Sequence, residues 1–285
     1  MERRVLTKEL IERFIQHLIQ EEKSQATLEK YQRDLTAFMR FVGESEMSKE
    51  VTIAYKQKLI TIGYAERSIN SMLAAINSFF TYLGWYECRV KALKLSPEIY
   101  RPEEKELTQK EYERLVNTAM RQGKAQLALI LQTICGTGIR ISELQFITVE
   151  AVRRGEAKVN CKGKTRKVFI VAALKQQLQQ FVQKHQLKRG AIFLSRSGKP
   201  INRTTVWREM KSLCKAAKVN PTKVFPHNLR HLFARVFYKL EKDIAKLADI
   251  LGHSSINTTR IYIISTGREH QRRMEKMGLV CPLRL

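Results

Sequence analysis

Residues 243–262 read DIAKLADILGHSSINTTRIY and predict two short helices joined by a tight turn. The apolar residues of the first part recur at helical spacing, and Gly252 ends that helix because glycine readily adopts the left-handed conformation of a helix end. Ser254 or Ser255 can cap the second helix, which carries Tyr262 about two turns from its start. A tyrosine at such a position is more often part of a core than a reactive group, and this stretch alone leaves both interpretations open.

The N-terminal third of the chain repeats the same helical spacing in four segments, which are residues 6–22, 24–43, 51–61 and 65–85. Their apolar and aromatic residues recur every three or four positions, which is typical of helices that bury one face. Gly43, Gly63 and Gly84 predict where the last three helices end. The opposite faces carry basic side chains that are candidates for contacts with phosphates: Lys30, Arg33 and Arg67.

A stretch without helical periodicity follows this part of the chain. Residues 93–106 combine two prolines with mixed charge, which is the composition of a linker. We therefore predict a helical domain of residues 1–92 and a second domain of residues 107–266. The second domain opens with Thr108 as a helix N-cap and Glu111 three residues later, the pattern of a capping box.

The second domain departs from a purely helical pattern. Residues 124–138, KAQLALILQTICGTG, are nearly all apolar and predict a buried helix that ends at Gly136. Residues 156–173 alternate around a basic turn and predict a β-hairpin, and residues 191–201 predict one more short strand. Helical spacing returns from residue 203. The predicted fold class is mainly α with a small inserted antiparallel β-sheet, divided into a helical domain and an α+β domain.

The net charge is the strongest signal in the composition. The 285 residues contain 52 Lys and Arg against 27 Asp and Glu, which gives a formal net charge of +25. Such a positive field favours a polyanionic partner, DNA or RNA. No apolar run is long enough to span a bilayer, and the N-terminus lacks the apolar core of a signal peptide, so we predict a cytoplasmic protein without a membrane partner. The five cysteines are far apart and form no CxxC pair, which predicts reduced thiols rather than disulfides or a zinc site.

Two basic motifs of the second domain are candidates for chemistry. Residues 136–145, GTGIRISELQ, place Arg140 directly after a glycine-bounded helix end, where an arginine needs an anion or an ion-pair partner such as Glu143. Residues 161–167, CKGKTRK, crowd four basic side chains at the hairpin turn: Lys162, Lys164, Arg166 and Lys167. Such a turn is either simply solvated or enters a DNA groove.

A third motif is PHNLRHLFA, residues 226–234. Pro226 suits a helix start, and His227 and Arg230 then lie three residues apart on one face, whereas we expect His231 to point elsewhere. Taken alone, each of these motifs is weak, because basic turns and polar helix pairs are common.

Together with Tyr262 and His253, the motifs contain every group needed to cleave a phosphodiester without a metal. Two arginines can neutralise the nonbridging oxygens, and a phenol, which is mostly protonated at neutral pH, can be activated as a nucleophile. A lysine or histidine can protonate the departing sugar oxygen. The sequence has no HExxH motif, no phosphate-binding GxxxxGK motif and no acidic cluster for magnesium, so we predict no metal and no cofactor.

GTGIRISEL, CKGKTRKVFI, PHNLRHLFA and LGHSSINTTRIY resemble, in order and spacing, the boxes of the tyrosine recombinases, also called the phage-integrase family. TLEKYQRDLTAFMRF and SINSMLAAINSFFTYLG are similar to the core-binding domain of its Xer-like members. The resemblance spans nearly the whole chain. It implies that the protein is a site-specific DNA recombinase that acts through a covalent 3′-phosphotyrosyl intermediate and a Holliday junction.

The resemblance also implies a role for each site residue. Tyr262 would be the nucleophile, and Arg140 and Arg230 would clamp the scissile phosphate. Lys162 would protonate the leaving 5′ oxygen, with Lys164 as the alternative acid. His227 would assist proton transfer at the tyrosine, and His253 would form a hydrogen bond to the phosphate. These six residues would be the catalytic set, and Glu143 would support it. The candidate DNA contacts are Lys30, Arg33, Arg67, Lys164 and Arg166.

The expected partners follow from the same resemblance. The chain begins directly with the core-binding domain, without the arm-type domain of larger integrases, which predicts a double-stranded DNA target with paired inverted half-sites. Residues 267–285 are expected to pack on a neighbouring protomer and so link four subunits into a homo-tetramer on DNA, associated with the nucleoid. Integration, excision, inversion and dimer resolution stay open as outcomes. Two alternatives are a type IB topoisomerase and a catalytically silent DNA-binding protein.

Overall fold

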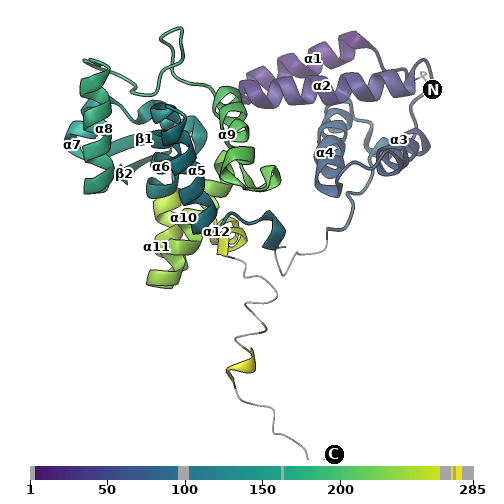
Figure 1. The fold of residues 1–285 in the computed structure, drawn as a ribbon. Coiled ribbons are helices and arrows are strands. Elements are labelled where there is room, and N and C mark those ends of the chain that lie inside the picture. The colour runs from purple at the N-terminus through teal and green to yellow at the C-terminus, as the bar shows by residue number, and fades with distance from the viewer. Residues whose placement is uncertain (1–3, 96–102, 162–163, 264–270, 272–273, 278–285) are drawn as a thin grey trace, which may run out of the picture. The chain divides into compact units, whose positions relative to one another are not determined.

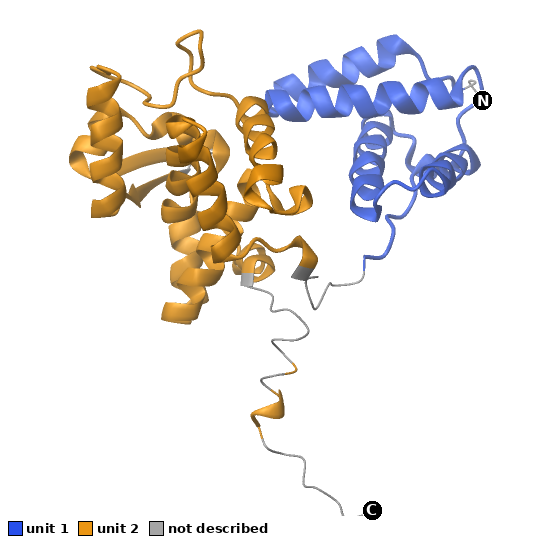
Figure 2. Ribbon diagram, in the orientation of Figure 1, with its two compact units in different colours: residues 1–97 blue, residues 98–285 orange. Residues whose placement is uncertain are grey.

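The chain forms two compact units, residues 1–97 and residues 98–285 (Figure 2). The division falls inside the stretch that we predicted to be a linker. The structure, a computed structural model, describes residues 4–95, 103–161, 164–263, 271 and 274–277. The C-terminal segment 267–285, which we predicted to pack on a neighbouring protomer, therefore lies mostly outside the described residues.

Unit 1 is a bundle of four helices (Figure 1), which are α1 (Lys8–Gln20), α2 (Gln25–Val42), α3 (Lys49–Thr61) and α4 (Glu66–Leu83), followed by the short helix η1 (Tyr86–Cys88). The four predicted helices are confirmed. Gly43 and Gly84 are the C-caps of α2 and α4, as predicted, whereas the C-cap of α3 is Ile62 and Gly63 follows it. Aromatic side chains fill the core, and Phe14, Phe38 and Phe79 are fully buried in it.

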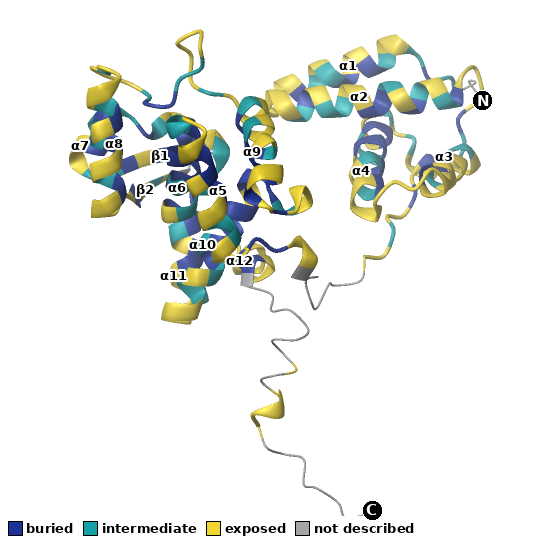
Figure 3. Cartoon of the chain, in the orientation of Figure 1, coloured by how far each residue is buried: buried dark blue, intermediate teal, exposed yellow. Residues whose placement is uncertain are grey.

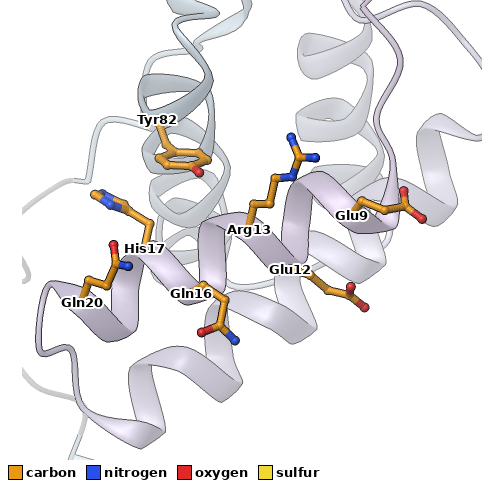
Figure 4. Close-up of a pocket in the computed structure, with 7 residues that line it drawn as sticks. All are labelled: Glu9, Glu12, Arg13, Gln16, His17, Gln20 and Tyr82. Atoms are coloured by element: carbon orange, nitrogen blue, oxygen red, sulfur yellow. The ribbon is translucent and has the colours of Figure 1, made fainter.

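The polar face of α1 borders a shallow hollow on unit 1. Figure 4 shows its lining side chains along α1, with Tyr82 of α4 above them. The Tyr82 ring stacks on His17 with 4.9 Å between ring centroids. Because glutamates and an arginine line the hollow together, it lacks the excess of positive charge that an anion would need.

Unit 2 is built of helices around one small sheet (Figure 1). Its elements in chain order are η2 (Glu103–Lys105), α5 (Gln109–Arg121), α6 (Ala125–Thr137), η3 (Ile141–Phe146), α7 (Val149–Arg154), β1 (Glu156–Cys161), β2 (Lys164–Phe169), α8 (Ala172–Lys184), α9 (Arg203–Ala217), η4 (Pro221–Lys223), α10 (Pro226–Glu241), α11 (Ile244–Leu251) and α12 (Ile256–Ile263). The buried residues gather where the helices meet, and α6 is buried along most of its length (Figure 3). The capping box of Thr108 and Glu111 is confirmed at the start of α5. No helix in the described part of the chain is long and apolar enough to cross a membrane.

The predicted hairpin is confirmed, and β1 pairs with β2 in antiparallel register. Ala157, Val159 and Val168 point into the core, as the alternation predicted. The further strand predicted over residues 191–201 is wrong. This segment forms only isolated bridges, between Thr148 and Ala191 and between Leu194 and Pro200. Its Ser, Gly and Pro residues fold the backbone into a tight turn instead, and proline has no N–H for a ladder.

The predicted end of the buried helix at Gly136 is also wrong, because α6 continues through Gly136 to Thr137 and Gly138 is its C-cap. Gly138 has a φ of +67°, a conformation that favours glycine. A Cβ atom at this position would lie 2.5 Å from a ring carbon of Phe233, whereas one at Gly136 would meet only Leu174 at 3.8 Å. Backbone conformation and close packing both require glycine at 138.

Gly138→Ala is expected to destabilise the protein more than Gly123→Ala. Gly123 has a similar φ of +72°, but a Cβ atom added there would have no neighbour within 4 Å, so its alanine variant measures the conformational penalty alone. The clash with Phe233 is expected to add about 1–3 kcal/mol to the loss at Gly138. Urea unfolding midpoints measure the difference, and equal losses in the two variants would contradict the packing requirement.

Candidate active site

The Arg230 side chain is fully buried in the interior of unit 2, with only 1% of its surface exposed. Its Nη1 donates to the carbonyl oxygen of Gly138 at 2.6 Å, and its Nη2 donates to that of Leu251 at 2.7 Å. These two carbonyls lie at the C-terminal ends of α6 and α11, where helix carbonyls lack partners within the helix and carry partial negative charge. The ends of two helices therefore hold one guanidinium.

The Arg230 guanidinium keeps its charge at neutral pH. Its burial, and secondly the charge of Arg140, lower the pKa of Arg230 to about 10, while Tyr262 and Glu143 act in the opposite direction. A pKa of about 10 leaves the group protonated at pH 7. The site thus contains a permanent cation in a largely dry environment, where its electrostatic interactions are strong.

Arg140 and Glu143 form the ion pair that the sequence left open as a structural alternative. The Glu143 carboxylate is 1% exposed and accepts from both the backbone N–H of Arg140, at 2.8 Å, and its Nη1, at 3.1 Å. The Arg140 side chain stays 31% exposed. The pair therefore fixes the guanidinium without covering it, and its structural role is compatible with a functional one.

His253 is held between Arg230 and Thr259. Its Nε2 lies 2.9 Å from Nη2 of Arg230, and its Nδ1 lies 2.9 Å from Oγ1 of Thr259. Because a guanidinium only donates hydrogen bonds, Nε2 accepts and the ring proton is on Nδ1. Burial, followed by the charges of Arg230 and Arg140, lowers the pKa of His253 to about 4, so the ring is neutral at pH 7.

Tyr262 both packs and meets polar partners. Its side chain is 6% exposed and belongs to an apolar cluster with Leu247 and Leu251. Its hydroxyl lies 3.1 Å from Nε2 of His227, and its ring centroid lies 5.9 Å from the Arg230 guanidinium. Core packing thus fixes the ring while the hydroxyl faces an imidazole.

The expectation that His231 points away from the site is wrong. Its ring stacks on the Tyr262 ring with 4.1 Å between centroids and an interplanar angle of 21°. His231 follows His227 by four residues, and residues four apart lie on the same face of a helix. The sequence therefore contained the signal for this contact.

The other predicted residues lie in different surroundings. Lys162 lies outside the described residues, and the structure describes Lys164 only by its backbone at the start of β2. Arg166 is 14% exposed, and its Nη2 bonds Glu143 at 2.7 Å. In unit 1, Lys30 and Arg33 both pair with Asp34, and Arg67 is exposed at the start of α4.

A cavity of about 480 Å³ is lined by Arg140, Arg166 and His253 among others, and a second one, of about 490 Å³, is lined by Arg140, His227 and Arg230 among others. Arg140 and Arg166 pair with the carboxylate of Glu143, and Arg230 lies close by. Asp249 also lines the first cavity, so three arginines meet two carboxylates and positive charge is in excess. Among the described residues, no group of three His, Cys, Asp or Glu side chains is arranged to hold a metal ion. The arrangement can bind a phosphate oxyanion and hold a phenol beside an imidazole.

Comparisons with known proteins show the family to which the chain belongs. The family model described as the phage integrase family matches residues 105–268, and the one described as the phage integrase N-terminal SAM-like domain matches residues 11–87. The tyrosine recombinase XerA of Pyrococcus furiosus is 28% identical over 287 residues, which cover 98% of this chain and 98% of the relative.

Two solved structures share the fold. A lambda integrase dimer bound to a COC′ core site has a TM-score of 0.75 and 20% identity, and the match covers 92% of this chain and 96% of that chain. A lambda integrase tetramer bound to a Holliday junction has a TM-score of 0.74 and 20% identity, covering 90% of this chain and 77% of that chain. At this identity the likeness concerns the fold alone.

The His253 ring is expected to titrate near pH 4 in the folded protein, which the C2–H signal in an NMR titration measures. Since the ordinary histidine pKa is about 6.5, the folded protein binds this proton less strongly than the unfolded chain. The free energy of unfolding therefore loses a contribution as the pH falls from about 6.5 to 4, and His253→Gln is expected to remove that contribution. A titration midpoint near the ordinary value would contradict the buried, neutral ring.

Proposed function

Because the chain belongs to the phage integrase family, the tyrosine recombinases, we propose that it cuts and rejoins double-stranded DNA at specific sites through a covalent 3′-phosphotyrosyl intermediate and a Holliday junction, without metal or ATP. The observation that carries the proposal is the position of Tyr262, whose hydroxyl lies 3.1 Å from Nε2 of His227 and whose ring centroid lies 5.9 Å from the buried Arg230 guanidinium. A tyrosine in an ordinary core has no need of three histidines and a buried cation around it.

The cleavage step exchanges one phosphoester for another. The phenolic oxygen of Tyr262 attacks the scissile phosphorus and forms a P–O bond, while the bond from phosphorus to the 5′ oxygen breaks. The phenol proton passes to His227, and the leaving 5′ oxygen takes a proton from Lys162, with Lys164 as the alternative acid. Attack of a 5′ hydroxyl on the phosphotyrosine reverses the step. Because the phosphotyrosyl bond replaces the DNA phosphoester bond, the free energy of that bond is conserved, and rejoining the strands needs no nucleotide hydrolysis.

Arg140 and Arg230 supply the charge that stabilises the transition state. Negative charge grows on the nonbridging oxygens during the attack, and cations that are already oriented stabilise it without rearrangement. Two carbonyl oxygens hold Arg230 and the Glu143 carboxylate holds Arg140, so both guanidiniums are oriented before DNA binds. Arg140 retains the exposed surface through which the phosphate would enter.

His253 needs an Nε2 proton to donate a hydrogen bond to the phosphate. In the free protein that nitrogen accepts from Arg230, and the surrounding positive charges disfavour protonation. A bound phosphodiester brings negative charge next to the same arginines and raises the pKa of the ring. DNA binding would thus convert His253 from an acceptor into a donor.

The assembly that we propose is a homo-tetramer on two DNA sites, each with paired inverted half-sites. The solved relatives support it, since lambda integrase is known as a dimer on a core site and as a tetramer on a Holliday junction. In the present protein, exchange of the segment 267–285 between protomers would link the subunits. The chemistry is common to integration, excision, inversion and dimer resolution, and a cytoplasmic, nucleoid-associated location stays a prediction.

A type IB topoisomerase uses similar chemistry to relax supercoiled DNA. The match of residues 11–87 to the phage integrase N-terminal domain favours the recombinase. Relaxation of a plasmid without any specific site, by the monomeric protein, would favour the topoisomerase instead. A silent DNA-binding protein would bind with a steep salt dependence and form no covalent product.

Tyr262→Phe is expected to abolish the covalent adduct with a nicked target DNA. The wild-type protein should give an adduct that resists SDS and is destroyed by protease, because a phosphotyrosyl bond survives denaturation. Tyr238→Phe is the matched control, since Tyr238 packs against the same apolar cluster. An adduct formed by the Tyr262→Phe variant would mean that another residue is the nucleophile.

A DNA substrate with sulfur in place of the scissile 5′ oxygen identifies the general acid. A thiol has a pKa of about 8.5 and leaves without a proton, so the acid becomes dispensable. We expect Lys162→Ala to slow cleavage of normal DNA by about 10²–10⁴-fold and to cleave the sulfur substrate at nearly the wild-type rate. Lys164→Ala is expected to cleave both substrates at nearly the wild-type rate. Arg140→Ala is the control, because it acts on the nonbridging oxygens and should not recover. Recovery of Lys164→Ala alone would assign the acid to Lys164.

A further inference from the structure

Arg166 occupies an inward position on the hairpin, although it is charged. It lies opposite Val159 in the β1–β2 register, and opposite residues of an antiparallel pair point to the same face. Val159 is buried, and the Arg166 side chain is 14% exposed. Its neighbour Lys167 points outward and is 59% exposed. Arg166 therefore differs from the basic residues that the hairpin presents to solvent.

The Arg166 guanidinium shares the Glu143 carboxylate with Arg140. Its Nη2 donates to Oε2 of Glu143 at 2.7 Å, and the same oxygen accepts the backbone N–H of Arg140 at 2.8 Å. The other carboxylate oxygen accepts from Nη1 of Arg140. The position of the carboxylate thus depends on both arginines, and any shift that follows the loss of Arg166 is passed to Arg140.

The stem of Arg166 also packs against the turn that carries His253. A Cβ atom at Gly252 would lie 2.6 Å from both Cδ and Nε of Arg166. Gly252 has a φ of +66°, and its carbonyl oxygen accepts from Nη2 of Arg140 at 3.4 Å. Arg166 therefore touches the residue that connects α11 to His253, and Arg140 bonds the same residue.

We propose that Arg166 is a positioning residue for strand cleavage: it holds the Glu143 carboxylate and the Gly252 turn, and through them Arg140 and His253, rather than contacting the DNA backbone. The inference rests on the proposed function, because Arg140 matters only if it acts on the phosphate. It replaces the initial expectation, drawn from the sequence, that Arg166 belongs with the solvent-facing DNA contacts of the hairpin.

The test compares Arg166→Gln with Lys167→Gln, which removes the same charge from the outward face of the same strand. At saturating DNA, Arg166→Gln is expected to slow adduct formation by about 10²-fold, since small displacements of catalytic groups have effects of this size. Its DNA affinity and the slope of log K against log salt should match those of the wild type. Lys167→Gln should cleave at the wild-type rate.

Three outcomes would overturn the proposal. If Arg166→Gln reduced the magnitude of the slope of log K against log salt by about 0.9 and left cleavage at saturating DNA unchanged, Arg166 would be a phosphate contact. If Arg166→Gln cleaved the substrate with a sulfur leaving group at the wild-type rate, Arg166 would act through the general acid. Unchanged cleavage and binding would equally remove its role.

A measurement on the free protein separates this inference from the proposed function. Arg166 is among the charges that lower the pKa of His253, so Arg166→Gln is expected to raise the NMR titration midpoint of His253, and Lys167→Gln to leave it in place. If the titration midpoint of His253 were unchanged in Arg166→Gln, the proposed contact between Arg166 and the Gly252 turn would be wrong. This result does not depend on whether Tyr262 forms an adduct.

Gly252→Ala provides a second variant that keeps every charge. The new methyl group would displace the Arg166 stem, and we expect cleavage to fall as in Arg166→Gln with DNA affinity unchanged. Gly155→Ala is its control, because Gly155 also has a positive φ, +81°, but a Cβ atom added there would approach only Lys175, at 3.6 Å. Equal cleavage by the two alanine variants would contradict the proposal.

Discussion

The burial of one guanidinium is the constraint on which the catalytic unit depends. Arg230 cannot leave water without hydrogen bonds, and it obtains them from the carbonyl oxygens at the ends of α6 and α11. Both helices must therefore end at the same point in space, and both end in glycines with positive φ, Gly138 and Gly252. Arg140 and His253, which closely follow these glycines, reach the same site for that reason. One buried charge thus organises two segments that are far apart in the chain.

The surroundings of this charge decide the protonation of the neighbouring groups. Two arginines share the Glu143 carboxylate and a third lies close by, so the cluster is positive before any anion arrives. Burial and the excess charge keep His253 neutral, and the hydrogen bond from Arg230 selects its tautomer. In the proposed function, the phosphodiester of the DNA would supply the missing negative charge. The same electrostatic imbalance that lowers the pKa of a histidine therefore favours the substrate that the family acts on.

The burial of Tyr262 is compatible with the role that we propose for it. Its ring packs with Leu247 and Leu251 and stacks on His231, so its orientation is fixed by apolar and aromatic contacts. Only the hydroxyl needs access to the phosphate, and it faces His227. In the proposed cleavage step, a ring with little freedom would hold the attacking oxygen in line with the phosphorus. Tyr262 is a core residue by its ring, and its hydroxyl is the group to which we assign the attack.

The order of residues along the chain was enough to predict the fold class, the helix starts at Thr108 and Pro226, the hairpin, and a set of motifs that contains Arg140, His227, Arg230, His253 and Tyr262. The helix starts and the hairpin can be predicted because their residues lie close together in the sequence. The site residues can be predicted because the motifs follow one another in the order of a known family. The turn at residues 191–201 and the contact of His231 also had local signals, in the Ser, Gly and Pro residues of that segment and in the four-residue spacing from His227. Two features depended on packing in three dimensions: the helix end at Gly138 rather than Gly136, and the inward position of Arg166. Phe233 packs against Gly138, and Glu143 and Gly252 pack against Arg166. Each of these partners is distant in the chain or on another element, and the local pattern of residues carries no information about which distant side chain fills the adjoining space.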